Sequence, residues 1–143
     1  MRKTVKVVII IAVIAVLATV LFSCKGNESK EDDGFTVNTD TYSRAEGHFH
    51  YDVTIDTEIK EEDLKVLKEL FNGKRLNNDA VPSCGFSEDI SIVFDDTHVF
   101  QLGQDRCGTI YCVDKDAYFD LSDSEAELMF EVLEKYGFHF PCV

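Results

Sequence analysis

The sequence contains no tryptophan and lacks the short motifs that mark several common catalytic sites. It has no G-x-S-x-G, H-E-x-x-H or S-x-x-K pattern, which would indicate a nucleophilic serine or a zinc protease. No glycine-rich loop of the kind that cradles a phosphate is present either. We therefore expect no cofactor and no enzymatic activity.

Positive charge is scarce beyond the first few residues. Three of the 14 basic residues precede residue 24, which leaves 11 against 27 acidic residues and a net charge of −16 for residues 25–143. Such a domain repels phosphate backbones and anionic lipid surfaces, which argues against nucleic-acid binding. The acidity alone does not identify a function, because solvated acidic faces are common.

The first 24 residues have the organisation of an export signal. Three basic residues (Arg2, Lys3 and Lys6) precede an uncharged, mostly apolar run of 16 residues, positions 7–22. A bilayer span needs about 20 residues, so this run fits a signal-peptide core better than a membrane-spanning helix. An uncleaved N-terminal anchor is the alternative. Both interpretations place residues 25–143 outside the cytoplasmic membrane.

The end of this segment, Leu21-Phe22-Ser23-Cys24, resembles the lipobox of bacterial lipoproteins. Leu21 and Ser23 match the pattern, whereas Phe22 is bulkier than the usual small residue. The resemblance implies cleavage before Cys24 and attachment of a diacylglycerol to the Cys24 thiol. The protein would then be held at the membrane by its lipid, facing the extracytoplasmic side.

Five cysteines occur, of which four remain if Cys24 is lipidated. An even number in a small exported domain predicts two disulfides, with three possible connectivities. A four-cysteine zinc site is the rival, but such sites usually bring cysteines in close pairs. Here the closest pair, Cys107 and Cys112, has four residues between its members, and no C-x-x-C motif exists.

Residues 25–47 are rich in charged and small polar side chains, which is typical of a flexible tether. We therefore expect one domain over residues 48–143. Phe49 to Asp56 alternates between apolar and polar side chains, which predicts a half-buried strand. Acidic first turns and terminal glycines predict helices over 61–72 and 123–136.

The region between these helices has the short alternating segments of an antiparallel meander. We expect its strands at 90–94, 98–102, 109–113 and 117–121. The element order β-α-β-β-β-β-α predicts an α+β fold, in which two helices pack on a small, disulfide-stapled antiparallel sheet. Most of the phenylalanines should fill the core, including Phe138 and Phe140 near the end of the chain.

From Cys84 onward, the sequence resembles small exported domains of predicted lipoproteins and surface proteins in Firmicutes. The resemblance rests on Cys84-Gly85-Phe86, residues 90–94, Asp105-Arg106-Cys107-Gly108 and Lys135-Tyr136-Gly137. Such domains have no defined activity, but cysteines at the positions of Cys84 and Cys107 tend to occur together. The resemblance therefore implies a Cys84–Cys107 disulfide, which leaves Cys112 to pair with Cys142.

One group of side chains could bind a metal. His48, His50 and Asp52 alternate along the first predicted strand, so two imidazoles and a carboxylate would share its solvent face. No matched fourth ligand is evident in the sequence, and an ordinary polar strand face explains the same pattern. We therefore predict no metal at this position.

These observations favour a membrane-anchored exported lipoprotein domain that binds a protein or another surface component. An exported inhibitor or immunity-type protein, whose acidic surface docks on a basic partner, is one alternative. A metal-dependent exported factor that uses His48 and His50 is another.

Overall fold

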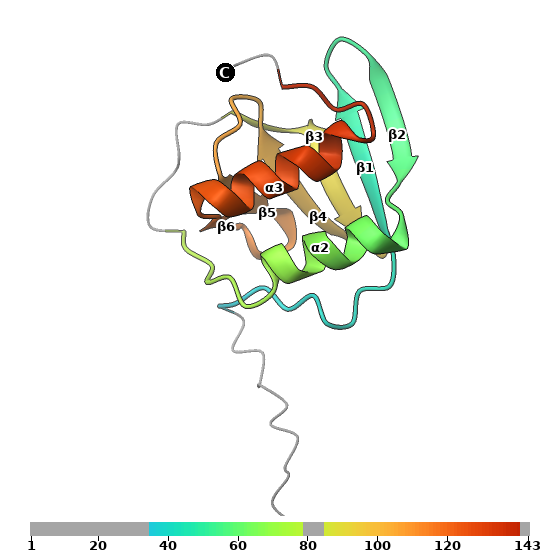
Figure 1. The fold of residues 1–143 in the computed structure, drawn as a ribbon. Helices are drawn as coiled ribbons and strands as arrows, with labels where there is room; N and C mark the ends of the chain where they lie inside the picture. Colours follow the sequence, from blue (N-terminus) through green and yellow to red (C-terminus); the bar gives the residue numbers. More distant parts are fainter. Residues whose placement is uncertain (1–34, 79–84, 141–143) are drawn as a thin grey trace, which may run out of the picture. The chain divides into compact units, whose positions relative to one another are not determined.

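The computed structural model describes residues 35–78 and 85–140, which all belong to one compact unit, Asp32–Val143 (Figure 1). Its elements are β1 (Ala45–His50), β2 (Thr54–Glu58), α2 (Glu61–Phe71), β3 (Phe86–Phe94), β4 (His98–Gly103), β5 (Thr109–Cys112), the 3-10 turn η1 (Val113–Lys115), β6 (Ala117–Asp120) and α3 (Asp123–Glu134). The strands form one antiparallel sheet in the order β2-β1-β3-β4-β5-β6. This arrangement confirms the predicted α+β fold with two helices, although the sheet has one strand more than expected.

Both helices pack on the same face of the sheet (Figure 1). Phe71 of α2 contacts Phe94, Phe100 and Phe119, whose side chains project from β3, β4 and β6. Phe130 of α3 contacts Phe140 in the C-terminal tail, and Phe140 in turn contacts Phe49 of β1. The predicted burial of Phe138 and Phe140 is confirmed, since they are 2% and 6% exposed.

The ends of the helices follow from local sequence. Ile59 and Leu64, on either side of the start of α2, are both buried, as expected for a hydrophobic staple. Ser122 and Glu125 form a capping box at the start of α3. Gly73 and Gly137 have φ values of 73° and 89°, in the left-handed region that glycine adopts most readily. Both glycines follow a helix, as predicted.

A buried carboxylate joins the two helices. Asp63 of α2 accepts hydrogen bonds from Lys135 Nζ at 2.7 Å and from the Tyr136 hydroxyl at 2.8 Å. Burial raises the pKa of Asp63, but these two donors outweigh it and the net shift is downward. Asp63 therefore stays ionised at neutral pH and links the start of α2 to the end of α3.

The prediction of one strand over residues 49–56 is wrong. Two strands, β1 and β2, occupy this region, and they pair as a hairpin in which Phe49 faces Ile55. Tyr51 and Val53, which were expected to be buried, lie in the turn and are 52% and 47% exposed.

The predicted tether is also too long. Residues 35–47 belong to the fold: Val37 is buried, and β1 begins at Ala45. The backbone of Val37 exchanges hydrogen bonds with Gly73 and Lys74, just beyond α2. Residues 25–34, the remainder of the predicted tether, lie outside the described residues, as does the export signal.

The predicted Cys112–Cys142 disulfide is wrong for this structure, because Cys112 is a buried free thiol. Cys112 lies on β5. Cys107 is not a free thiol, and Cys84 and Cys142 lie outside the described residues.

Candidate functional site

The face of the sheet opposite the two helices carries a continuous row of polar side chains. Directly paired residues of antiparallel strands point to the same side of the sheet. The pairing aligns one residue from each strand in the order Asp56, His48, Ser91, Gln101, Tyr111 and Tyr118. One end of the row is therefore ionisable, and the other end is aromatic.

At the aromatic end, Phe86 packs against Tyr111 and Tyr118 with ring centroids 6.1 and 5.4 Å apart. Phe86 was expected in the core between sheet and helices, but it lies on the opposite face and is only partly buried. A shift in the β3–β4 register between Phe86 and Ser91 accompanies this change of side.

At the ionisable end, two histidines of β1 converge on one carboxylate of β2. His48 Nδ1 lies 2.6 Å and His50 Nε2 lies 2.7 Å from the same oxygen, Asp56 Oδ1. The hydrogen bonds from His48 and His50 lower the pKa of Asp56, so this carboxyl group is ionised at neutral pH. We call His48, His50 and Asp56 the histidine cluster.

The histidine cluster differs by one residue from His48, His50 and Asp52, the candidate ligands for which the sequence predicted no metal. His48 and His50 come together as expected, but Asp52 lies in the hairpin turn and pairs with His139 of the tail at 2.8 Å. Asp56 takes the place of Asp52 because the chain reverses after His50 and places Asp56 opposite His48. The sequence analysis would have found this third residue only if it had predicted a hairpin over this region and not one strand.

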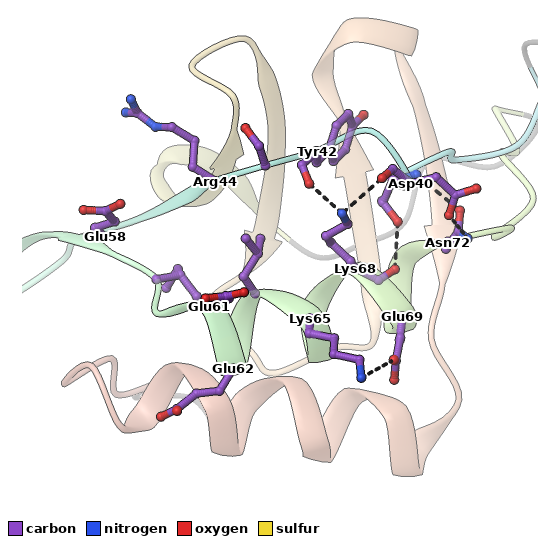
Figure 2. A pocket seen from close by; sticks show the side chains of 14 residues that line it. Asp40, Tyr42, Arg44, Glu58, Glu61, Glu62, Lys65, Lys68, Glu69 and Asn72 are labelled. Carbon is purple, nitrogen blue, oxygen red and sulfur yellow. Dashed lines mark hydrogen bonds and ion pairs between the residues drawn. The ribbon is translucent and has the colours of Figure 1, made fainter.

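A groove of about 870 Å³ lies between α2 and the segment over residues 39–44 (Figure 2). Its lining comes from that segment (Thr39, Asp40, Tyr42, Ser43, Arg44), from the entry to α2 (Glu58, Ile59) and from α2 and its C-cap (Glu61, Glu62, Leu64, Lys65, Lys68, Glu69, Asn72). Neither histidine nor cysteine is among these residues, so the groove offers no imidazole base and no thiol.

The positive charges of this groove are all engaged. Lys68 donates to the backbone carbonyls of Asp40 and Tyr42, as Figure 2 shows. Arg44 pairs with Glu46 and Asp96, and Lys65 lies 4.0 Å from Glu69.

The negative charges at one end of the groove are not neutralised in this way. Glu58, Glu61 and Glu62 form no ion pair within the described residues. The potential in this part of the groove is therefore negative.

A second cavity of about 380 Å³ contains both His98 and Cys112 among its lining residues. His98 Nδ1 is 2.6 Å from Asp114, and burial raises the pKa of the Cys112 thiol. A protonated thiol is a poor nucleophile, and no hydrogen bond joins Cys112 to His98 in the described structure. This pair therefore lacks the activation that a cysteine–histidine catalytic dyad needs.

Within residues 35–78 and 85–140, no helix has the length and apolar character required to cross a membrane. Comparisons of the chain with protein-family models, curated proteins and solved structures find no match.

Proposed function

We propose that this protein is an exported, membrane-anchored lipoprotein whose domain is a non-enzymatic binding module. Its groove along α2 takes a basic, extended segment of another exported protein. The observation that carries the proposal is the charge of the groove, where Glu58, Glu61 and Glu62 have no ion-pair partner among the described residues.

The lipid anchor rests on the N-terminal sequence. A basic start, an apolar run over 7–22 and the lipobox-like residues 21–24 support cleavage before Cys24. Mass spectrometry of the protein isolated from cell membranes tests the cleavage site and the lipid anchor. We expect a diacylated Cys24 at the new N-terminus, and an intact Met1 would refute cleavage.

A disulfide between Cys84 and Cys107 is part of this proposal. Cys107 is not a free thiol, and the sequence resemblance pairs it with Cys84. The bond would tie the segment that precedes β3 to the loop that precedes β5. Peptide mapping without reduction should recover the Cys84 and Cys107 peptides joined, and recovery of either peptide with a free thiol would contradict the pairing.

The shape of the groove supports a polypeptide rather than a small metabolite. It is open along α2 and it combines apolar residues, Ile59 and Leu64, with acidic side chains. A basic segment could place its charged ends near Glu58 and Glu62. Charge complementarity of this kind raises association rates and fixes orientation more than it raises affinity.

In-cell photo-crosslinking tests the protein partner. A photoreactive residue at position 65, within the groove, should give a discrete crosslinked product with an exported protein. The substitutions Glu58→Lys and Glu62→Lys should abolish the product, whereas Glu131→Lys, on an exposed position of α3 outside the groove, should not.

Salt provides a second readout with the purified pair. Binding should weaken as ionic strength rises, because screening reduces attraction between exposed charges. Equal loss of the crosslink in all three lysine variants, or an affinity that is independent of salt, would contradict docking in this groove.

A further inference from the structure

The histidine cluster brings three potential metal ligands close together. The ligand atoms of His48, His50 and Asp56 lie within 4.8 Å of one another. The backbone dictates this convergence, because His48 pairs directly with Asp56 across the hairpin. His50 lies two residues further along β1, so its side chain projects from the same face.

The other two histidines provide an internal comparison. His98 contacts Asp114 at 2.6 Å, and His139 contacts Asp52 at 2.8 Å. Each of these is a simple pair of one imidazole and one carboxylate. Among the described residues, only the cluster on β1 and β2 brings together three side chains that could hold a metal.

We propose that the histidine cluster binds one Zn²⁺ ion through His48 Nδ1, His50 Nε2 and the carboxylate of Asp56. Two imidazole nitrogens and a carboxylate oxygen form a ligand set that suits zinc, whereas Ca²⁺ and Mg²⁺ require oxygen ligands. Three protein ligands leave the fourth tetrahedral position open to water or to a group from a partner.

The distances are compatible with a zinc ion between the three side chains. Zinc binds nitrogen at about 2.0–2.1 Å and carboxylate oxygen at about 2.0–2.2 Å, which separates tetrahedral ligand atoms by roughly 3.3 Å. The present separations of His48 Nδ1 and His50 Nε2 from Asp56 Oδ1 are 2.6 and 2.7 Å. Side-chain rotations would have to lengthen these two contacts by less than 1 Å and bring the two imidazole nitrogens, which lie within 4.8 Å of each other, to a similar separation.

A second carboxylate lies behind the cluster. Glu46 Oε2 is 4.0 Å from His48 Nε2, the ring nitrogen that would not bind the metal. Metal-bound histidines usually donate their other ring N–H to a carboxylate, which fixes the orientation of the ring. Glu46 is therefore placed to orient His48 with a small movement.

The ion has access to the site, and the site is built on a rigid part of the fold. The side chains of His48, His50 and Asp56 are 26%, 37% and 55% exposed. β1 is paired on both sides, with β2 and β3, so its histidines project from an internal strand. This inference does not depend on the proposed partner groove.

Zinc titration of the full-length chain in detergent tests the site. Accessible thiols of the native protein are first alkylated, so that exposed cysteines cannot bind the metal, and the buffer contains excess Mg²⁺. We expect one Zn²⁺ per chain. Each of the substitutions His48→Ala, His50→Ala and Asp56→Asn should weaken binding by about tenfold or more, and the matched controls His98→Ala and His139→Ala should leave it unchanged.

Nitrogen-15 NMR of the histidine rings in the unmodified sequence provides a readout that does not depend on any variant folding. Zinc should shift the ring resonances of His48 and His50 and leave those of His98 unchanged. Absence of zinc binding, an affinity unaffected by His50→Ala, or equal losses in all five variants would overturn the proposal.

Discussion

Gly47 shows how one absent side chain shapes the packing of the tail. It lies on β1 directly beneath Phe138, and a Cβ atom at Gly47 would lie 2.9 Å from Phe138 Cζ. Real Cβ atoms essentially never approach another atom this closely, so the absence of a side chain at Gly47 gives the Phe138 ring the space that it occupies next to β1.

We predict that Gly47→Ala destabilises the domain by about 1–3 kcal/mol, the usual cost of overpacking a core. Urea unfolding followed by circular dichroism measures this change. Gly85→Ala is the matched control, because no atom lies within 4 Å of a Cβ at Gly85. An equal effect of both substitutions would show that steric contact with Phe138 is not the cause.

Cys112 should behave as an inert core residue. Burial raises the pKa of its thiol, so little thiolate is available to react at neutral pH. Iodoacetamide should therefore modify Cys112 slowly in the native protein and rapidly after unfolding, as peptide mapping will show. Rapid native modification, or recovery of Cys112 in a disulfide, would contradict the observed environment.

The sequence revealed the two histidines of the cluster but not their carboxylate. Alternation along a strand places His48 and His50 on one face, whatever follows them. Whether Asp52 or Asp56 completes the set depends on where the chain turns, which is a property of the strand pairing. Metal-ligand patterns within one strand are therefore easier to read from sequence than patterns across two strands.

At the scale of elements, the failure to see the β1–β2 hairpin has a geometric cause. Phe49 pairs with Ile55, six positions later, so both residues share one face. An even separation preserves the alternation through the turn, and the hydrophobic pattern cannot distinguish one long strand from a hairpin. The turn, Tyr51 to Val53, also lacks the Asn-Gly or Asp-Gly signal that usually marks a hairpin.

The start of α3 is secured by an acid that should make stability depend on pH. Glu125 accepts hydrogen bonds from Lys74 Nζ at 2.7 Å and from the Ser122 backbone N–H at 2.8 Å. The Lys74 donor first, and then Ser122, lower the pKa of Glu125 to about 2 from an ordinary value of 4.5. A carboxylate with a lowered pKa contributes stability above its unfolded pKa, and loses it as the pH falls through its folded pKa.

We therefore predict that Glu125→Gln destabilises the domain by about 1 kcal/mol at neutral pH, the typical cost of weakening a helix cap. Thermal unfolding from pH 7 to pH 2 should show this difference shrinking below about pH 4.5 and vanishing near pH 2. Glu131→Gln, on an exposed position of the same helix, is the control and should have little effect. A difference that persists unchanged at pH 2 would rule out the carboxylate as its cause.

At the scale of the whole molecule, the fold class could be predicted because both helices carry strong local signals. Their acidic first turns, apolar stripes and terminal glycines are properties of neighbouring residues. Similarly, the Asp95 and Asp96 turn between β3 and β4 is read from residues that tolerate positive φ, and both have it, at 47° and 64°.

The start of the domain could not be predicted, because residues 35–47 pack through backbone pairing and a few buried side chains. Their polar composition resembles that of a tether. Thr39 is nevertheless buried, and its hydroxyl donates to the Lys68 carbonyl of α2 at 2.9 Å. Polar side chains that satisfy a helix end are indistinguishable by composition from side chains that face solvent.

This difference yields a prediction about where the folded domain begins. A chain that starts at residue 35 should unfold cooperatively, and the midpoint of its unfolding transition should equal that of a chain that starts at residue 25. In a chain that starts at residue 48, the free energy of unfolding should fall by several kcal/mol, which is a large part of the 5–15 kcal/mol found for a typical domain. This chain lacks half of β1, the buried residues Val37 and Ala45, and the backbone bonds from Phe35 and Val37 to the end of α2.

Circular dichroism and native-state hydrogen exchange of the three chains measure this effect. Loss of Ala45 to Gly47 shortens the pairing of β1 with both β2 and β3, so exchange protection should fall on both neighbouring strands. Protection on β5 and β6 should fall only if unfolding is global. Equal stability of the chains that start at residues 35 and 48 would contradict this prediction. It would mean that the packing of residues 35–47 on α2 does not contribute to the stability of the domain.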